Sequence, residues 1–289
     1  MAKYIISTDS ASDLPESYYK ENGVVCAPLF YNIDGVVYGG EEKLSTEEFY
    51  DLLEEGKTAT TSAVVPDDLK NELRPYLEQG YDVLHLAFSS GLSSSCQNAF
   101  IAANDLMEEF PDRKVTVIDT KCASLGQGLF VYKCVELKNK GMEMEELAKW
   151  AEDHVQSTIH FFTVDNLESL YRGGRVSKAT LVVASIANIK PVMRVDEAGK
   201  LVGFKNVRGR KKSLATLADL MAERMDTGDI KNDTFFISHS DCAGEARELA
   251  ETIKNRTGIQ NYMIAPISPT IGAHTGRGCI ALFFFGKNR

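Results

Sequence analysis

The chain has 289 residues, of which 44% are apolar and 25% charged, and its formal net charge at pH 7 is −9. This length suffices for one large or two ordinary domains that enclose a cavity. The ordinary composition argues against extensive disorder or a fibrous repeat, and the acidic balance argues against nucleic acid as a partner, because such binding relies on clustered Lys and Arg.

In the first half, short β-branched runs alternate with longer segments of 3.6-residue periodicity, as in strands joined by crossover helices. We predict buried parallel strands at residues 4–7, 81–88 and 114–119, and helices at 14–22, 93–110 and 124–140. Between them, Ser45 and Glu48 have capping-box spacing ahead of a helix that ends at Gly56. The N-terminal part is therefore predicted to be a doubly wound, mainly parallel α/β fold.

The pattern changes after a predicted helix at residues 144–156. Further strands are expected at 159–164, 189–195, 201–207, 234–239 and 279–285. The short turn between the second and third of these predicts an antiparallel hairpin. We therefore predict two domains: an N-terminal α/β domain at residues 1–157, and a C-terminal α/β domain with a mixed or antiparallel sheet at residues 158–289.

The start of the chain reaches a polar turn at Asp9 after a very short apolar run, so we expect neither a signal peptide nor a membrane span there. No later apolar stretch is long enough to span a bilayer. The six cysteines show no C-x-x-C pair or metal-finger spacing and are expected to be free, mostly buried thiols of a reducing cytosol. We expect a cytoplasmic protein without stable membrane insertion.

Two hydroxyl-rich stretches are candidates for ligand binding. Residues 60–62 (Thr-Thr-Ser) form a predicted loop between two helical patterns, and residues 89–95 (Ser-Ser-Gly-Leu-Ser-Ser-Ser) lie between a strand end and a helix start. Ligands of open α/β sheets bind outside the carboxyl ends of the strands, where free N–H groups of a helix start attract carboxylates or phosphates. The alternative is that these serines only cap the helix.

A third candidate is His274, which stands among glycines directly before the last predicted strand. Backbone rich in glycine can approach a ligand closely, and imidazole can donate a hydrogen bond to a carboxylate near neutral pH. The alternative is a purely structural histidine. His85 and His160 lie in predicted strands and are expected in the core, whereas His154 is expected to be solvated.

Several catalytic patterns are absent. Residues 91–95 lack the second glycine of the G-x-S-x-G nucleophile elbow. The hypothesis of a hydrolase nevertheless stays open, because a serine here could act with a distant histidine. Neither a complete dinucleotide-binding loop nor a phosphate loop is present, so we expect no ATP site and no cofactor. Asp9 and Asp119 are expected to cap turns rather than bind a metal, and no metal site is predicted.

Two basic segments, at residues 171–178 and 207–212, stand out on an acidic chain. A local cationic patch can attract an acidic partner or a phosphate. The alternative is a solvated face with helix-capping charges.

Taken in order, these stretches resemble the DegV family of fatty-acid-binding proteins over essentially the full length. Residues 7–15 are similar to the family's T-D-S-x-x-D-L-P start, and residues 61–62 and 89–93 to its T-S and S-S-x-L-S turns. Residues 167–176 match L-x-x-L-x-x-G-G-R-[IV], and residues 188–191 and 272–276 complete the set.

The resemblance implies an acyl chain buried between or within the N-terminal domain and a C-terminal domain similar to one in dihydroxyacetone kinases. It implies a carboxylate held by Thr61, Ser93 and His274, so these and their neighbours Ser62, Ser94 and Thr275 are the predicted ligand-binding residues.

It also implies that the bound long-chain fatty acid is presented to a separate ATP-dependent fatty acid kinase catalytic subunit, which makes an acyl phosphate for phospholipid synthesis. Contact with this kinase is predicted at Arg172, Arg175 and Arg208.

Three departures from the family pattern concern the head-group pocket and the chain preference. Residues 63–65 are Ala-Val-Val where glutamine and then proline-serine are usual, Ser94 replaces a glycine, and Arg277 replaces a common proline.

Two other function classes remain open at this stage. The chain could be an enzyme, either an esterase with Ser93 as nucleophile and His274 as base, or a phosphotransferase subunit that uses His274. It could also be an interaction module whose basic segments serve regulation.

Overall fold

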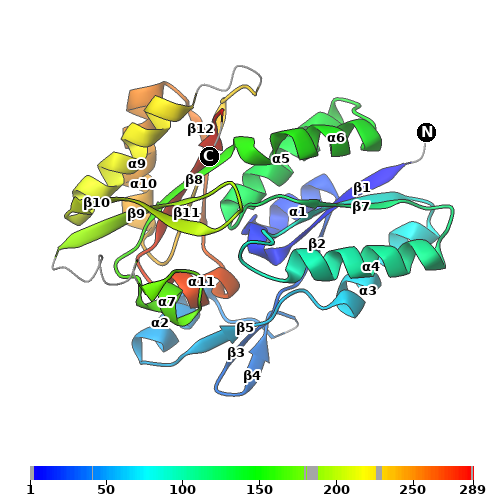
Figure 1. Cartoon of the computed structure of the whole chain (residues 1–289), viewed down its shortest axis with the longest axis horizontal. Helices are drawn as coiled ribbons and strands as arrows, with labels where there is room; N and C mark the ends of the chain where they lie inside the picture. The colour runs from blue at the N-terminus through cyan, green and yellow to red at the C-terminus, as the bar shows by residue number, and fades with distance from the viewer. Residues whose placement is uncertain (1–2, 41, 179, 181–187, 226–229, 288) are drawn as a thin grey trace.

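The protein is described by a computed structural model that covers residues 3–40, 42–178, 180, 188–225, 230–287 and 289. Two β-sheets lie side by side, and a third, small sheet lies below the line where they meet (Figure 1). The predicted α/β class with a parallel and a mixed sheet is confirmed.

The parallel sheet belongs to the N-terminal half. Its order is β2 (Val24–Ala27), β1 (Tyr4–Asp9), β6 (Asp82–Ala87) and β7 (Val115–Asp119). On one face lie α3 (Pro66–Glu78) and α4 (Ser95–Glu109), on the other α5 (Leu125–Asn139) and α6 (Met144–His154), and α1 (Glu16–Asn22) packs beside β2. β2 follows β1 on one side of the sheet centre, and β7 follows β6 on the other side. The direction in which successive strands are added therefore reverses between β1 and β6, which is the switch point of the sheet.

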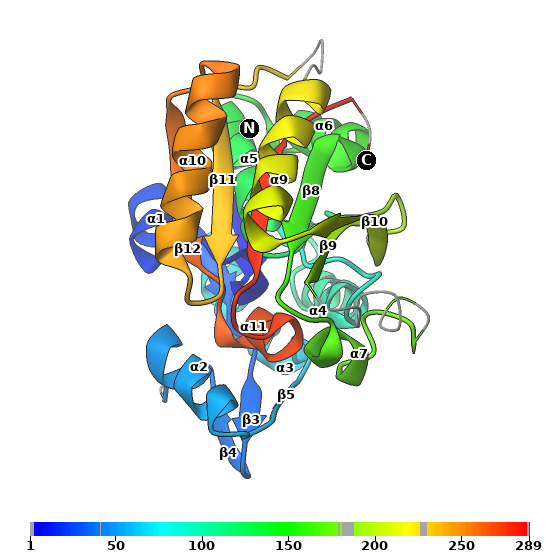
Figure 2. The same cartoon turned by 90° about the vertical axis from the view of Figure 1, so that its left-hand side faces the viewer.

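The mixed sheet belongs to the C-terminal half. Its order is β10 (Leu201–Arg208), β9 (Ile189–Val195), β8 (Thr158–Thr163), β13 (Ile280–Phe285), β11 (Thr234–His239) and β12 (Asn261–Pro266). Only β11 and β12 pair in parallel. The predicted hairpin of β9 and β10 is confirmed, with Val195 opposite Leu201. Helices α9 (Arg210–Arg224) and α10 (Ala243–Thr257) cover the outer face (Figure 2).

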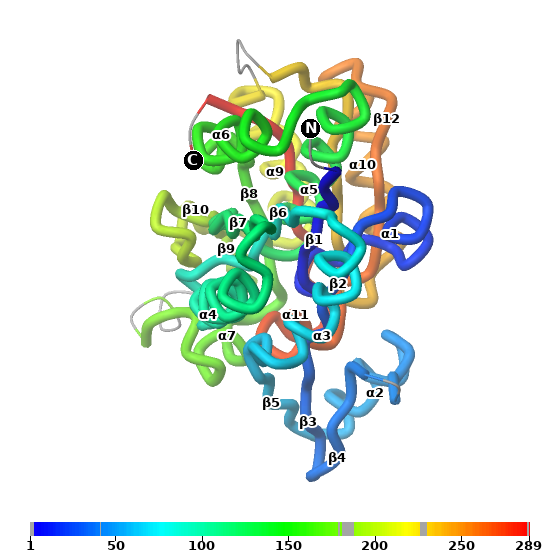
Figure 3. The backbone as a smooth tube through the Cα atoms, turned by 90° about the vertical axis from the view of Figure 1, so that its right-hand side faces the viewer, coloured from blue at the N-terminus to red at the C-terminus, as the bar shows by residue number. Residues whose placement is uncertain are grey.

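The third layer was not predicted. It contains β3 (Tyr31–Ile33), β4 (Val36–Tyr38), β5 (Ala59–Thr61) and α2 (Thr46–Glu54), and we call it the lower layer because it projects below both large sheets (Figures 2 and 3). The prediction of a loop at residues 60–62 is wrong for Thr60 and Thr61, which pair with β3. Strands of three residues are too short to show periodicity. The capping box of Ser45 and Glu48 is confirmed.

The lower layer is fixed to the rest of the chain by aromatic packing. Tyr31, Phe49 and Tyr50 form one buried cluster with Ala273 of α11 (Pro269–Thr275). The Tyr50 hydroxyl donates to Ser240 Oγ at 2.9 Å and lies 3.3 Å from the Ile267 carbonyl oxygen. These contacts hold β5 beside α11.

Helix α5 joins the two large sheets. It packs against β1 on one side and against β8, β11 and β13 on the other, so the central apolar cluster contains residues of both halves. The described residues also form the short helices η1 (Ser10–Ser12), η2 (Val155–Ser157) and α7 (Glu168–Arg172). The division into domains at residue 157 stays a prediction.

The six cysteines are free thiols, and four of them are buried, as predicted. His85 and His160 are core residues, also as predicted. The prediction of a solvated His154 is wrong, because its ring stacks on Trp150 and is only partly exposed. Within the described ranges, no helix has the length and apolarity needed to cross a bilayer.

Candidate functional site

A cavity of about 250 Å³ lies where the two large sheets, the lower layer and α11 meet. Its wall includes Phe88, which directly follows β6, so the cavity lies at the carboxyl ends of the parallel strands, where open α/β sheets favour ligands. All six predicted ligand-binding residues line it, namely Thr61, Ser62, Ser93, Ser94, His274 and Thr275. The sequence motifs, which are spread over more than two hundred residues, therefore come together at one place.

Thr61 and His274 are in direct contact. Thr61 Oγ1 of β5 lies 2.9 Å from His274 Nε2 of α11. Burial, together with the nearby positive charge of Arg175, lowers the pKa of His274 to about 4. The imidazole is therefore neutral at pH 7 and carries one N–H.

The orientation of His274 is set by the end of α7. Its Nδ1 atom is buried and has no hydrogen-bond partner among the described residues. A Cβ atom added at Gly173 would lie 2.2 Å from this Nδ1, so the ring packs directly on the Gly173 backbone. A larger residue at position 173 would displace the imidazole, which gives the first glycine of the Gly-Gly-Arg segment a steric role.

Ser93 lies in the turn before α4. Its Oγ atom accepts from Ser95 N at 3.1 Å and lies 2.9 Å from Ser95 Oγ. Ser95 Oγ in turn accepts from Val64 N at 3.1 Å. Val64, one of the residues after Ser62 that depart from the family pattern, thus contributes to the site through its backbone N–H. Its side chain is buried in the core.

Two of the other three predicted residues are more exposed. Ser62 and Ser94 are exposed at the cavity rim, and Ser94 makes no side-chain cap at the start of α4. Thr275 Oγ1 lies 3.3 Å from Ser240 Oγ and is held within the C-terminal half.

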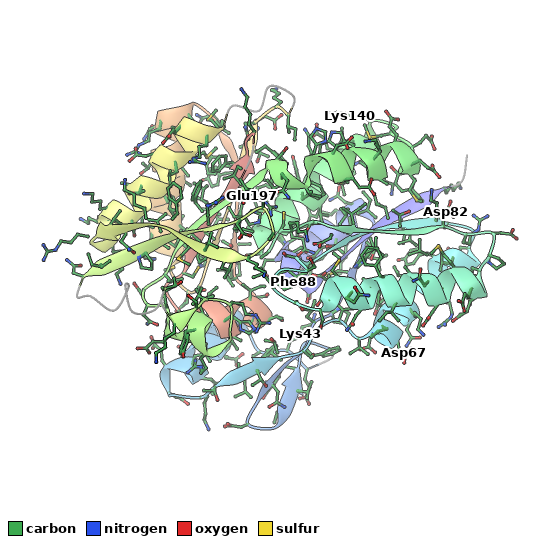
Figure 4. All side chains as sticks on the ribbon, viewed as in Figure 1. Lys43, Asp67, Asp82, Phe88, Lys140 and Glu197 are labelled. Atoms are coloured by element: carbon green, nitrogen blue, oxygen red, sulfur yellow. The ribbon has the colours of Figure 1, made fainter. Side chains whose placement is uncertain are left out.

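The rest of the wall is largely apolar. Cys279, Ala281 and Phe283 line the cavity at every second position, and the last two face it from β13. Phe88, labelled in Figure 4, directly follows β6 and lies near the centre of the molecule, between the two large sheets. No site role was predicted for these side chains, because residues 279–285 are apolar throughout and the sequence alone does not distinguish a cavity-lining face from a packed one.

A buried polar junction borders the cavity and was not predicted. Ser124 lines the wall, donates to Asp13 Oδ2 and lies 2.8 Å from Ser238 Oγ of β11. Asp13 Oδ1 accepts from Ser268 N at 3.2 Å, so the carboxyl group connects the two halves of the chain. Burial raises the pKa of Asp13 to about 7. Ser124 has φ 54° and ψ −148°, an uncommon backbone conformation for a residue with a side chain.

Asp9 and Asp119 have the capping roles that the sequence predicted. Asp9 Oδ1 accepts from Ala11 N at 3.2 Å and Oδ2 from Phe88 N at 2.8 Å, which joins the ends of β1 and β6 at the switch point. Asp119 Oδ1 accepts from Ser90 N at 3.2 Å. In the part of the chain that the structure describes, no group of three or more His, Cys, Asp or Glu side chains is arranged to hold a metal ion.

The three arginines of the predicted kinase contact differ in environment. Arg172 and Arg208 are exposed. Arg175 is partly buried, lines the cavity, and donates to the Leu92 carbonyl oxygen through Nε at 3.2 Å and through Nη2 at 3.0 Å.

Arg277, which stands where the family commonly has proline, joins the lower layer to the C-terminal half. Its guanidinium lies 3.4 Å from Asp51 Oδ1 and 2.5 Å from Glu54 Oε2 of α2, and also pairs with Asp241. Where the family commonly has a rigid proline, this chain therefore has ion pairs that link α2 to the C-terminal half, close to the end of α11.

Residues 3–287 match the family described as "Uncharacterised protein, DegV family". A DegV domain-containing protein of Clostridium perfringens is 38% identical over 100% of this chain and 99% of its own length. The fatty-acid-binding DegV family protein of Streptococcus agalactiae has a similar structure, with a TM-score of 0.86, 28% identity, and 100% of each chain covered. A Thermus thermophilus DegV family protein, for which fatty acid binding is described, gives a TM-score of 0.85 at 29% identity over 98% of this chain and 99% of its own.

Proposed function

This chain belongs to the DegV family, and on that basis we propose that it binds a long-chain fatty acid in the cavity and places the carboxylate at Thr61, Ser93 and His274. The observation that carries the proposal is a cavity whose wall is mostly apolar but also includes hydroxyl groups and an imidazole. An amphipathic molecule with a long alkyl chain and a small anionic head matches this distribution.

The energetics favour retention of such a ligand. Each methylene group removed from water contributes about 0.8 kcal/mol, so an alkyl chain of about 16 carbons is held strongly even when part of that gain is lost to ordering. A buried carboxylate is tolerated only when it is hydrogen-bonded. Two hydroxyl groups and the single N–H of a neutral imidazole provide suitable donors.

We assign the proton of His274 to Nε2. Nδ1 packs on Gly173 and has no acceptor within reach among the described residues, whereas Nε2 faces Thr61 Oγ1 at 2.9 Å. An Nε2–H group can donate to a ligand oxygen, and Thr61 can then direct its own hydroxyl proton to the same carboxylate.

The protein does not transform the fatty acid unaided in this proposal. It presents the carboxylate to a separate fatty acid kinase in the cytosol, which supplies ATP and metal and forms an acyl phosphate for phospholipid synthesis. The exposed Arg172 and Arg208 are the residues best placed for contact with an acidic face of that kinase. No cofactor of its own is required.

The esterase alternative has little geometric support. A serine nucleophile needs a hydrogen bond to its base, and the base needs an orienting acid. Here Ser93 Oγ contacts Ser95, while His274 Nε2 contacts Thr61. His274 Nδ1, where the acid belongs, packs on Gly173 instead.

The proposal is tested by extracting the purified protein with organic solvent and analysing the extract by mass spectrometry. We expect about one fatty acid per chain, or stoichiometric uptake of added fatty acid after delipidation. A protein that carries no fatty acid and takes up none would overturn it. Turnover of activated esters that is lost in a Ser93→Ala variant would favour the esterase instead.

The presentation step needs a second measurement, with the kinase subunit and ATP. Arg172→Gln and Arg208→Gln are expected to lower acyl phosphate formation at limiting protein while fatty acid affinity stays unchanged. Unchanged turnover in the double variant would place the kinase contact elsewhere.

A further inference from the structure

Thr270 is a polar residue in the largely apolar wall of the cavity and does not belong to the head-group site. It lines the cavity and is only 7% exposed. Its hydroxyl group has no hydrogen-bond partner among the described residues. We propose that Thr270 and Ser124 form a second polar subsite, which binds a hydroxyl group in the middle of the alkyl chain, so that mid-chain hydroxy fatty acids are ligands. This inference rests on the fatty-acid-binding function proposed above.

The subsite lies about one helical turn from the head-group site. Thr270 precedes His274 by four residues in α11, and residues four apart lie on the same face of a helix. At a rise of about 1.5 Å per residue, these two positions are roughly 6 Å apart along the helix axis. Ile271 lines the cavity from the same helix. An alkyl chain whose carboxylate is held at His274 therefore reaches Thr270 with a carbon well removed from the head group.

Ser124 brings a second hydroxyl group to the wall, and Asp13 links it to the helix that carries Thr270. The Asp13 carboxyl group accepts from the hydroxyl of Ser124, which directly precedes α5. It also accepts from the N–H of Ser268, which directly precedes α11, at 3.2 Å. One carboxyl group therefore holds the starts of the two helices together, and each start contributes a hydroxyl group to the cavity wall.

The pairing of β11 with β13 places Ser124 at the middle of the wall. Ser124 Oγ lies 2.8 Å from Ser238 Oγ, and Ser238 pairs with Ala281 of β13. Ala281 stands between Cys279 and Phe283 in the set of three residues that line the cavity at every second position. The subsite therefore faces the part of the cavity that the middle of a long alkyl chain would occupy.

The free hydrogen-bonding capacity of the two hydroxyl groups favours a hydroxyl group on the ligand. The Thr270 hydroxyl has one O–H and two lone pairs, and no described residue uses them. Ser124 gives its proton to Asp13 and accepts from Ser238, which leaves one lone pair. A plain alkyl chain offers no partner to these atoms, and a buried polar group without a partner is destabilising. A hydroxyl group on the chain can donate to both oxygens and accept from Thr270.

The test compares octadecanoic acid with the same acid carrying a hydroxyl group at mid-chain, using the purified full chain and a displaceable fluorescent lipid. Thr270→Val keeps the shape of the side chain and removes its hydroxyl group. We expect the variant to bind the hydroxy acid about tenfold more weakly, the effect of one lost hydrogen bond, and the plain acid at least as tightly as the wild type does. Thr163→Val is the matched control, because Thr163 is also buried with an unpaired hydroxyl group but is not part of the cavity lining.

Wild-type affinity of Thr270→Val for the hydroxy acid, or equal losses for both acids, would overturn the subsite and leave the binding function standing. A wild-type protein that binds neither acid would overturn both. If Thr270→Val does not fold, two smaller changes decide: Thr270→Ser keeps the hydroxyl group and must keep the wild-type ratio of the two affinities, whereas Thr270→Ala must lose it. With the ligand hydroxyl moved to the carbon next to the carboxylate, Thr270→Val should have no effect, and a persisting loss would also overturn the subsite.

Discussion

Thr61 and His274 are 213 positions apart in the sequence, yet their side chains meet at 2.9 Å. The contact joins a short edge strand of the lower layer to the helix that precedes β13. Neither residue has another described hydrogen bond that would hold its functional group in place. The geometry of the head-group site therefore depends on how firmly the lower layer is packed on α11.

His274→Ala is expected to weaken fatty acid binding by about 1.5–3 kcal/mol, because a hydrogen bond to a charged group is lost and a cavity is left beside it. His154→Ala is the matched control, since His154 is partly buried but bonds only to the Trp150 carbonyl oxygen and is not part of the cavity lining. Displacement titrations of both variants measure the difference. Equal losses would show that the head group is assigned to the wrong place.

Gly173→Ala tests the steric support of His274. Gly173 has φ −73°, so alanine fits the backbone, but its Cβ would lie 2.2 Å from His274 Nδ1. We expect overpacking to shift the imidazole, so that fatty acid binding weakens by about 1.5–3 kcal/mol, the contribution of a hydrogen bond to a charged group. Gly244→Ala, in α10 with open space around its Cβ, serves as control and should bind normally. Normal binding by Gly173→Ala would mean that the ring is free to move.

Most strands of the two large sheets were predictable because they carry the signals that sequence analysis uses, whereas β2 and β12 were not predicted. β1, β6 and β7 are short, largely apolar runs bounded by polar turns, and the predicted bounds differ from the observed ones by at most two residues. Strands buried on both faces must be apolar at nearly every position. The hairpin of β9 and β10 followed from its short turn alone.

The lower layer and the junction at Asp13 could not be predicted in the same way. β3, β4 and β5 have three residues each, and their pairing is fixed by the packing of Phe49 and Tyr50 against α11. Asp13 and Ser124 are ordinary turn and cap residues in the sequence, and their buried hydrogen bond exists only because α5 lies between two sheets. The head-group residues were found through the family resemblance, since hydroxyl-rich turns alone do not distinguish binding from capping.

Asp13→Asn is expected to change how stability depends on pH. The folded state raises the pKa of Asp13 to about 7, whereas an unfolded aspartate titrates near about 4. Between these values the folded chain holds a proton that the unfolded chain has released, so the contribution of Asp13 to stability is complete below about pH 4 and is lost as the pH rises towards 7. Asparagine does not titrate and keeps an acceptor for Ser268 N. Melting temperatures at pH 4 to 8 should therefore fall less steeply in the variant, and parallel curves would contradict the assignment.

Ala281→Leu tests whether the acyl chain runs along β13. Ala281 is buried and lines the cavity between Cys279 and Phe283. The side chains of Ile280 and Leu282 are buried on the opposite face of β13. The larger side chain fills part of the space near the middle of the wall, so acids of 16 to 18 carbons should bind about tenfold more weakly or worse, at a cost of roughly 1–3 kcal/mol. An acid of about 10 carbons, which needs fewer of the wall contacts, should lose much less and serves as the internal control. The ratio of the two affinities separates a shortened cavity from general destabilisation, because a loosened fold would weaken both acids alike.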